Sequence, residues 1–105
     1  MSGISTHVLD LSSGTPARGI PVRLLRDGRE LSTALTDADG RCTALLPADS
    51  CLDGGTYHLV FEVQSRFPEG FYPEVTVAFV VRDPASHYHV PLLISAFGYT
   101  TYRGS

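Results

Sequence analysis

Three histidines and one arginine are the residues of this sequence best suited to proton transfer and to binding a polar substrate. His87 and His89 stand two residues apart, His7 lies near the beginning, and Arg41 follows the turn Asp37-Ala38-Asp39-Gly40. Histidine changes protonation near neutral pH and can act as a general acid or base. Arginine offers a fixed fork of donors to an anion or a polarised carbonyl. The pattern favours acid–base chemistry, and the plain alternatives are a solvated histidine face and a tight turn that leaves Arg41 exposed.

A metal centre is the other chemistry that this pattern could serve. A His-x-His pair on one strand can place two imidazoles on one ion, and His7 could supply a third ligand. The sequence offers no acidic residue close to His87 and His89 to complete a zinc site. The segment Asp37-Ala38-Asp39-Gly40 resembles part of a calcium loop but lacks the rest of the pattern and its closing glutamate. We therefore expect neither a metal nor a cofactor.

Short strands separated by turn residues account for most of the chain. The expected strands are Ile4–Leu11, Ile20–Arg26, Glu30–Thr36, Arg41–Leu46, Tyr57–Val63, Glu74–Arg82, His87–Ser95 and Tyr99–Arg103. Asp27-Gly28 between two strand-like runs predicts a tight hairpin. One short helical turn is expected between Val63 and Phe71. About eight strands at this spacing are typical of an all-β sandwich.

Alternation along the strands predicts which side chains share a face. His87 and His89 project to one side with Pro91 and Leu93, and the opposite, core side of that strand carries Tyr88, Val90, Leu92 and Ile94. His7 shares a face with Ser5, Leu9 and Leu11. Histidines mixed with apolar residues suit an interface better than a free surface. His58, beside Glu62 on the polar side of its strand, is expected to be exposed and without a role.

The bulk composition limits the function classes. At 105 residues the chain is expected to form one domain, 1–105, and a chain this small often gains burial by oligomerising. A net charge of −3 gives no basic footprint for nucleic acid, and no segment is long enough for a membrane helix. We see no export signal and expect a cytoplasmic location, in which Cys42 and Cys51 would be structural, reduced thiols.

Five blocks of the sequence resemble one known family. They are Ser5-Thr6-His7-Val8-Leu9-Asp10, Thr36-Asp37-Ala38-Asp39-Gly40-Arg41, Phe71-Tyr72-Pro73-Glu74-Val75, His87-Tyr88-His89-Val90-Pro91-Leu92-Leu93 and the ending Tyr102-Arg103-Gly104-Ser105. In this order they resemble the signatures of the 5-hydroxyisourate hydrolases, the transthyretin-related proteins. The ending distinguishes these hydrolases from transthyretin, a hormone carrier of the same fold. Ala96-Phe97 stands where the family usually has Pro-Tyr, and Thr100 where a serine is common.

The resemblance implies a transthyretin-like sandwich of two four-stranded sheets and a homotetramer, a dimer of dimers with active sites in the channel between dimers. It implies catalytic roles for His7, Arg41 and His89, and substrate binding by the terminal residues Tyr102, Arg103, Gly104 and Ser105. His87 is carried over as a substrate-binding residue because it precedes the second histidine of the motif. No cofactor, nucleic acid or membrane is implied.

The reaction implied by the resemblance is hydrolysis of a ring amide of 5-hydroxyisourate, a purine-derived small molecule, in urate degradation. The product is 2-oxo-4-hydroxy-4-carboxy-5-ureidoimidazoline. His7 or His89 would activate water while the other orients or donates, and the sequence does not distinguish them. Two alternatives remain: a carrier of a flat aromatic ligand that uses the same channel without turnover, and a purely structural sandwich.

Overall fold

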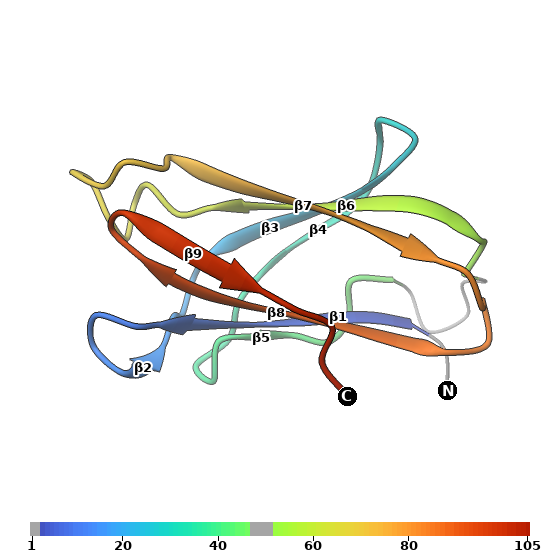
Figure 1. Cartoon of the computed structure of the whole chain (residues 1–105), viewed down its shortest axis with the longest axis horizontal. Coiled ribbons are helices and arrows are strands. Elements are labelled where there is room, and N and C mark those ends of the chain that lie inside the picture. Colours follow the sequence, from blue (N-terminus) through green and yellow to red (C-terminus); the bar gives the residue numbers. More distant parts are fainter. Residues whose placement is uncertain (1–2, 47–51) are drawn as a thin grey trace.

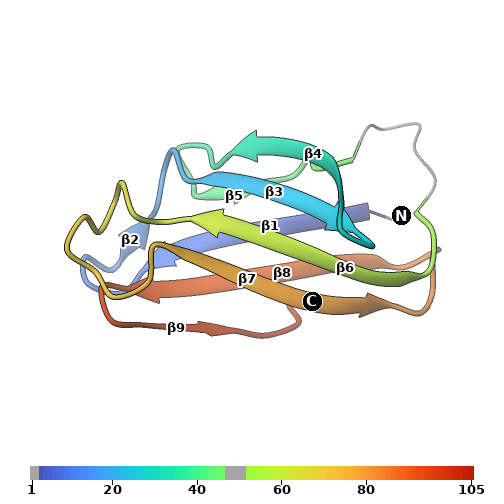
Figure 2. The same cartoon turned by 90° about the horizontal axis from the view of Figure 1, so that it is seen from above.

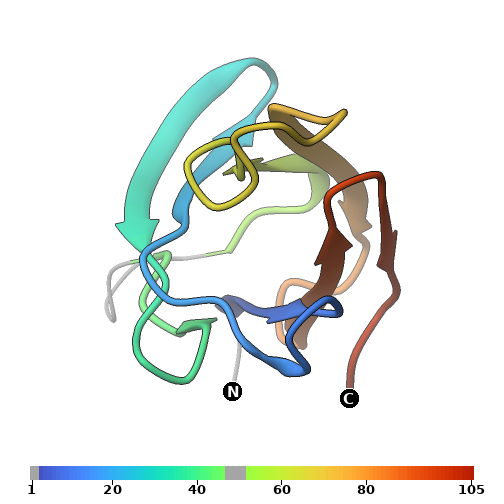
Figure 3. The same cartoon turned by 90° about the vertical axis from the view of Figure 1, so that its left-hand side faces the viewer.

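Two β-sheets face each other across an apolar interior, as the end-on view in Figure 3 makes clear. The computed structural model describes residues 3–46 and 52–105. The strands are β1 (Gly3–Asp10), β2 (Thr15–Pro16), β3 (Pro21–Arg26), β4 (Arg29–Leu35), β5 (Arg41–Cys42), β6 (Gly55–Glu62), β7 (Glu74–Val81), β8 (His87–Ser95) and β9 (Gly98–Thr101). One sheet has the order β4-β3-β6-β7, and the other has the order β2-β1-β8-β9 with β5 also paired to β1 (Figures 1 and 2).

The all-β sandwich predicted from the sequence is confirmed, with a fifth short strand in one sheet. That strand, β2, lies in a Pro-containing run that reads as a turn, yet Thr15 and Pro16 pair with Asp10 and Leu9. The Asp27-Gly28 hairpin is also confirmed. Both residues have positive φ, 53° and 77°, as a two-residue turn between antiparallel strands requires.

The short helix expected between Val63 and Phe71 is wrong, since no helix occurs in residues 3–46 or 52–105. The segment instead makes two short turns. In the first, the N–H groups of Arg66 and Phe67 both donate to the Val63 carbonyl, each at 3.1 Å, and in the second the Gly70 N–H donates to the Phe67 carbonyl at 2.9 Å. Pro68 has no N–H to continue such a ladder and disfavours helical backbone at the preceding residue. The same part of the structure contains no helix long and apolar enough to cross a membrane.

The core forms from the inward faces of both sheets, as alternation along the strands predicts. Tyr88, Val90, Leu92 and Ile94 of β8 are all buried, as are Tyr57, Leu59, Phe61 and Val63 in and just after β6. Each fully buried side chain of this size contributes about 1.5–3 kcal/mol. The opposite face of β8, which carries His87 and His89, is therefore the outer face of its sheet, and the core supports it from behind.

Candidate active site

A parallel pairing between β1 and β8 brings the first histidine motif beside the second. The register sets Ser5 opposite His89 and His7 opposite Pro91. Residues directly opposite in neighbouring strands share a face, so Ser5 and His7 lie on the outer side of the sheet with His87 and His89. Two segments more than 80 residues apart in the chain thus form one polar surface.

The turn before Arg41 fixes that residue beside His7. β5 pairs with β1 so that Arg41 stands opposite His7. The Asp37 carboxylate accepts hydrogen bonds from the N–H groups of Asp39 and Arg41, at 2.9 and 3.0 Å, which closes the turn. Gly40 has a φ of +76°, and a Cβ there would lie 2.4 Å from the Val8 carbonyl oxygen, so the position needs glycine.

A pocket of about 220 Å³ opens where these elements meet. Its lining residues come from β1, β5, β8 and the last residue of the chain: Ser5, Thr6, Arg41, Thr43, His87, His89 and Ser105. Four of the residues proposed from the sequence, Arg41, His87, His89 and Ser105, are thus brought together. Thr43 carried no signal in the sequence, and Ser5 was visible only as a residue on the same strand face as His7.

The Ser5 hydroxyl connects the two histidines of β8. Its Oγ lies 2.8 Å from Nε2 of His87 and 2.8 Å from Nδ1 of His89. Burial, reinforced by the positive charges of His7, His87 and Arg41, lowers the pKa of His89 from its usual value of 6.5. His89 therefore stays neutral to a lower pH than an ordinary histidine, as a general base at neutral pH must.

His7 stands beside this pocket and not in its lining. Its ring is half-buried, and its Nε2 is enclosed with no hydrogen-bond partner among the described residues. A buried ring nitrogen without a partner costs free energy unless something else binds it. The nitrogen thus has an unused hydrogen-bonding position, which a water molecule or a bound substrate could reach only if the side chains around it move.

The last four residues continue the β8–β9 pairing after an interruption. Pro91 has no N–H, and the regular pairing ends at Thr101, but the Gly104 N–H donates to the His89 carbonyl at 2.8 Å. Gly104 thus packs on the His89 ring: a Cβ there would come within 2.5 Å of the ring's Cδ2 atom.

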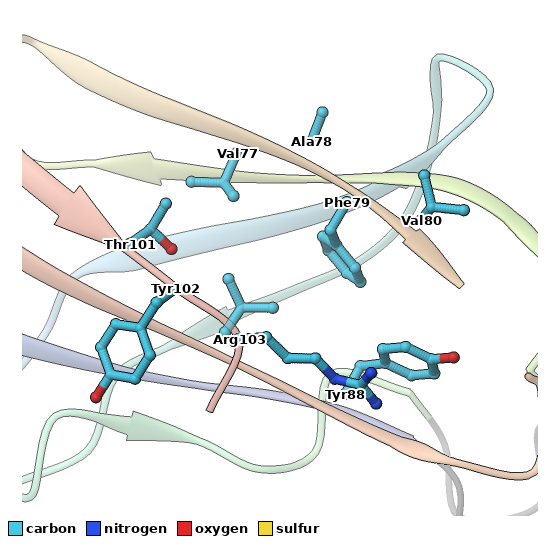
Figure 4. Close-up of a pocket in the computed structure, with 9 residues that line it drawn as sticks. Val77, Ala78, Phe79, Val80, Tyr88, Thr101, Tyr102 and Arg103 are labelled. Carbon is cyan, nitrogen blue, oxygen red and sulfur yellow. The ribbon is translucent and has the colours of Figure 1, made fainter. Parts of the chain in front are cut away.

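Arg103 points away from the histidines, because alternation turns it to the opposite face of the sheet. Its guanidinium lies over the Tyr88 ring, 4.5 Å from the centroid, in the apolar groove drawn in Figure 4. Tyr102 turns its ring away from Arg103 in the same view and is 57% exposed. In the terminal segment, Gly104 and Ser105 therefore lie at the histidine pocket, whereas Arg103 is held on the opposite face of the same sheet.

Two other residues considered in the sequence, His58 and Cys42, lie outside this cluster. His58, expected to be exposed, is half-buried on β6 of the other sheet. Cys42 is buried on β5, and burial together with the nearby Asp37 charge raises the pKa of its thiol to about 11, so the thiol is protonated and unreactive. Cys51 lies outside the described residues. Within residues 3–46 and 52–105, no three histidine, cysteine or acidic side chains are grouped to hold a metal.

Comparison with known proteins agrees with the fold and identifies the family. The model of the HIUase/Transthyretin family matches residues 4–104. A mouse (Mus musculus) protein named 5-hydroxyisourate hydrolase is 45% identical over 99% of this chain and 96% of its own length. The solved structure of Klebsiella pneumoniae 5-hydroxyisourate hydrolase superposes with a TM-score of 0.90 at 39% identity, covering 100% of both chains.

Transthyretin from Sparus aurata superposes almost as well, with a TM-score of 0.89, but at 24% identity over 99% of this chain and 97% of that one. At that identity the similarity establishes the fold alone. The sandwich of two facing β-sheets is the architecture of a transthyretin-like protein. This chain belongs to the HIUase/Transthyretin family.

Proposed function

We propose that this protein is an enzyme that hydrolyses 5-hydroxyisourate to 2-oxo-4-hydroxy-4-carboxy-5-ureidoimidazoline in urate degradation. The observation that carries the proposal is the grouping of His89, Arg41 and Ser105 around one pocket, with His7 beside it. A relative with 45% identity over nearly the whole chain bears the name of this hydrolase. The arrangement also supplies the groups that opening a ring amide requires.

His89 is the proposed general base. Its Nδ1 is occupied by Ser5, which leaves Nε2 as the nitrogen that can take a proton from water. General-base assistance of this kind is worth roughly 100- to 10,000-fold in rate. The unpartnered Nε2 of His7 is placed to orient the water or to protonate the departing nitrogen.

Arg41 is the proposed donor to the substrate oxygens. A ring carbonyl under attack becomes an oxyanion, and two parallel N–H groups stabilise it better than a point charge does. Arg41 of β5 and His89 of β8 line the same pocket from the two sides of β1, so the attacking water and the developing oxyanion would lie over β1 between these two side chains.

The terminal residues have divided roles in this proposal. Gly104 and Ser105 contact the substrate side, while Arg103 and Tyr102 hold the segment in place. His87 acts from the rim of the pocket through Ser5. Protein groups supply all the proton transfers, so a chelator is expected to leave the rate unchanged.

A homotetramer, a dimer of dimers that closes over this pocket, is part of the same proposal. The pocket of one chain, about 220 Å³, is below the roughly 300–1,000 Å³ of a typical small-molecule site. Phe71, Phe97 and Tyr99 are exposed apolar side chains, which a second copy would cover. Light scattering should return four chains per particle, and a fully active monomer would contradict this. A cytoplasmic location remains a proposal, which cell fractionation tests.

The test is the ultraviolet absorbance of freshly made 5-hydroxyisourate with and without the protein. Because this compound decays spontaneously, the expected result is an acceleration proportional to protein concentration. His89→Gln should remove it, while His58→Gln on the other sheet should not. Saturable binding of the compound by wild-type protein without acceleration would instead indicate a carrier.

A further inference from the structure

One serine hydroxyl bridges the two histidines of β8. Ser5 is 7% exposed, and the parallel register holds its Oγ within 2.8 Å of a ring nitrogen on each side. Among the described residues these two nitrogens are its sole hydrogen-bond partners. Gly3 underlies the other nitrogen of His87: a Cβ there would lie 3.4 Å from that Nδ1. The three side chains therefore form a short, sterically defined chain of hydrogen bonds.

A hydroxyl carries one proton and two lone pairs, and two arrangements keep that proton within the chain. Both nitrogens can also donate to the hydroxyl at once, but its own proton then has no partner among the described residues, which is costly for a buried group. In the first, His87 Nε2–H donates to Ser5 and Ser5 donates to His89 Nδ1, so that a neutral His89 carries its proton on Nε2. In the second, Ser5 donates to His87 Nε2 and accepts from His89 Nδ1–H, so that Nε2 of His89 has a free lone pair. Protonated His87 has a proton on both nitrogens, so of these two arrangements only the first remains, and it alone gives the Ser5 proton a partner.

We propose that Ser5 is a positioning residue that makes the tautomer of His89 depend on the protonation of His87. When His87 is neutral, His89 can present a lone pair to the pocket. When His87 takes up a proton, the hydroxyl reverses and a neutral His89 presents an N–H instead. The coupling itself is a property of the free protein, and its catalytic consequence rests on the function proposed above.

In that reaction the coupling makes His89 a base when His87 is neutral. Nε2 of His89 takes a proton from water as the oxygen attacks the ring carbonyl, while Nδ1–H keeps donating to Ser5 and Ser5 keeps donating to His87. The C–N bond of the ring amide then breaks, and the proton on Nε2 passes to the departing nitrogen. Water's proton ends on the product, and both histidines return to their starting state.

The charges around the hydrogen-bonded series His87–Ser5–His89 explain why coupling through a hydroxyl is useful at this site. His7 of β1 and Arg41 of β5, the strand beyond β1, place positive charge near His89. Backbone hydrogen bonds from Arg41 and Asp39, with the charges of Arg41 and His7, lower the pKa of the nearby Asp37 carboxyl. Burial and the cationic neighbours lower the pKa of His89, so a positive charge there is costly. A donor–acceptor chain leading to exposed His87 orients the ring without adding another fixed charge.

Nitrogen NMR of the imidazole rings tests the coupling without substrate. The chain has four histidines, so the ring nitrogens of each can be assigned and followed as pH is lowered. In wild-type protein we expect the proton of neutral His89 to move from Nδ1 to Nε2 as His87 is protonated. In Ser5→Ala the titration of His87 should no longer change the tautomer of His89. An unchanged His89 tautomer across the titration of wild-type His87 would overturn the proposal.

Kinetics gives a second readout, because a merely structural serine would not alter the pH profile. Ser5→Ala should lower kcat about 10- to 100-fold, the usual effect of removing a partner that orients a functional histidine. KM should change less than kcat. His87→Gln keeps an amide oxygen that accepts from Ser5 at every pH, so the decline of kcat caused by His87 protonation should disappear. If that decline persists in His87→Gln, the proposal is wrong.

Matched controls separate folding from coupling. Ser95→Ala removes a half-buried hydroxyl from β8, one that donates to the Gly98 carbonyl, and His58→Gln removes a histidine from the other sheet. Both should retain the wild-type pH profile. If Ser5→Ala does not fold, His87→Gln still tests the proposal. If the tautomers are coupled but 5-hydroxyisourate is not hydrolysed, the proposed function is wrong and the coupling is supported. If 5-hydroxyisourate is hydrolysed but the tautomers are not coupled, the coupling is wrong and the proposed function is supported.

Discussion

Gly104 packs directly on the ring of His89. Its N–H donates to the His89 carbonyl at 2.8 Å, and a Cβ at Gly104 would lie 2.5 Å from the ring's Cδ2 atom, so even one methyl group must displace the ring. We predict that Gly104→Ala lowers kcat on the order of 100-fold, the cost of a misplacement of about 1 Å. Steady-state kinetics on 5-hydroxyisourate is the measurement.

The control for this variant is Gly98→Ala. A Cβ at Gly98 would have the Ser95 hydroxyl as its nearest neighbour, at an ordinary van der Waals distance of 3.8 Å. That variant should keep nearly wild-type activity and melting temperature. If both alanine variants are equally active, the close approach of Gly104 to His89 has no catalytic consequence.

Alternation along single strands was enough to predict much of this site. It placed His87 and His89 on one face of β8 and Tyr88 on the other, and the burial of β8 confirms that division. The opposite direction of Arg103 follows from the same rule, since antiparallel pairing sets Gly104 opposite His89.

Contacts between distant strands were beyond the sequence. The Ser5 bridge exists because β1 and β8 pair in parallel in one particular register, and a shift by one residue would send Ser5 into the core. Alternation within β1 carries no information about that register. Strand ends were also missed where pairing decides them: the strand expected over Arg41–Leu46 pairs at Arg41 and Cys42, while Leu45 turns into the core.

Arg41 is predicted to act through paired hydrogen bonds and not through charge alone. Arg41→Lys should therefore lose nearly as much kcat/KM as Arg41→Ala, because a lysine ammonium cannot reproduce the planar fork. Removing such a donor to a developing oxyanion costs about 100- to 1,000-fold. Kinetics of both variants is compared with Arg29→Lys, an exposed site in the β3–β4 hairpin. Near-normal activity of Arg41→Lys would mean that Arg41 acts through its positive charge alone and not through paired hydrogen bonds.

Arg103 is predicted to anchor the terminal segment through Tyr88. A cation over an aromatic ring contributes about 0.5–2 kcal/mol, so Arg103→Ala should loosen the segment without unfolding the protein. Hydrogen exchange of the Gly104 N–H should accelerate, and kcat should fall. Arg103→Lys retains a cation and should show a smaller effect on both. A rise in KM with unchanged exchange at Gly104 would point instead to direct contact between Arg103 and the substrate.

The pKa of His89 gives a prediction with a definite sign. Burial first, and then the charges of His7, His87 and Arg41, lower it below 6.5, so NMR titration of the free protein should find His89 neutral at pH values where an ordinary histidine is half protonated. Arg41→Gln removes one of these charges and should raise the pKa of His89. Arg29→Gln, in the exposed β3–β4 hairpin of the other sheet, serves as the control and should leave the pKa of His89 unchanged. A lower His89 pKa in Arg41→Gln would contradict this account of the site's electrostatics.

Asp10 is predicted to make stability depend on pH through its bond with Arg66. The carboxylate is 5% exposed and accepts from Arg66 Nε at 2.8 Å and from the Ser12 N–H at 2.8 Å, joining the end of β1 to the turn after β6. Although burial opposes ionisation, these bonds hold the pKa of Asp10 below its usual 3.8. A carboxyl group whose pKa is lower in the folded state stabilises the fold above its unfolded pKa and loses that contribution as pH falls through the folded value.

Asp10→Asn should therefore lower the free energy of unfolding by about 1–3 kcal/mol at neutral pH, and the difference from wild type should shrink as pH falls below 3.8. Urea unfolding at a series of pH values measures this, with Asp27→Asn in the exposed hairpin as the control, because asparagine tolerates the positive φ at that position. A difference for Asp10→Asn that stays constant down to acid pH would mean that the charge of Asp10 does not contribute.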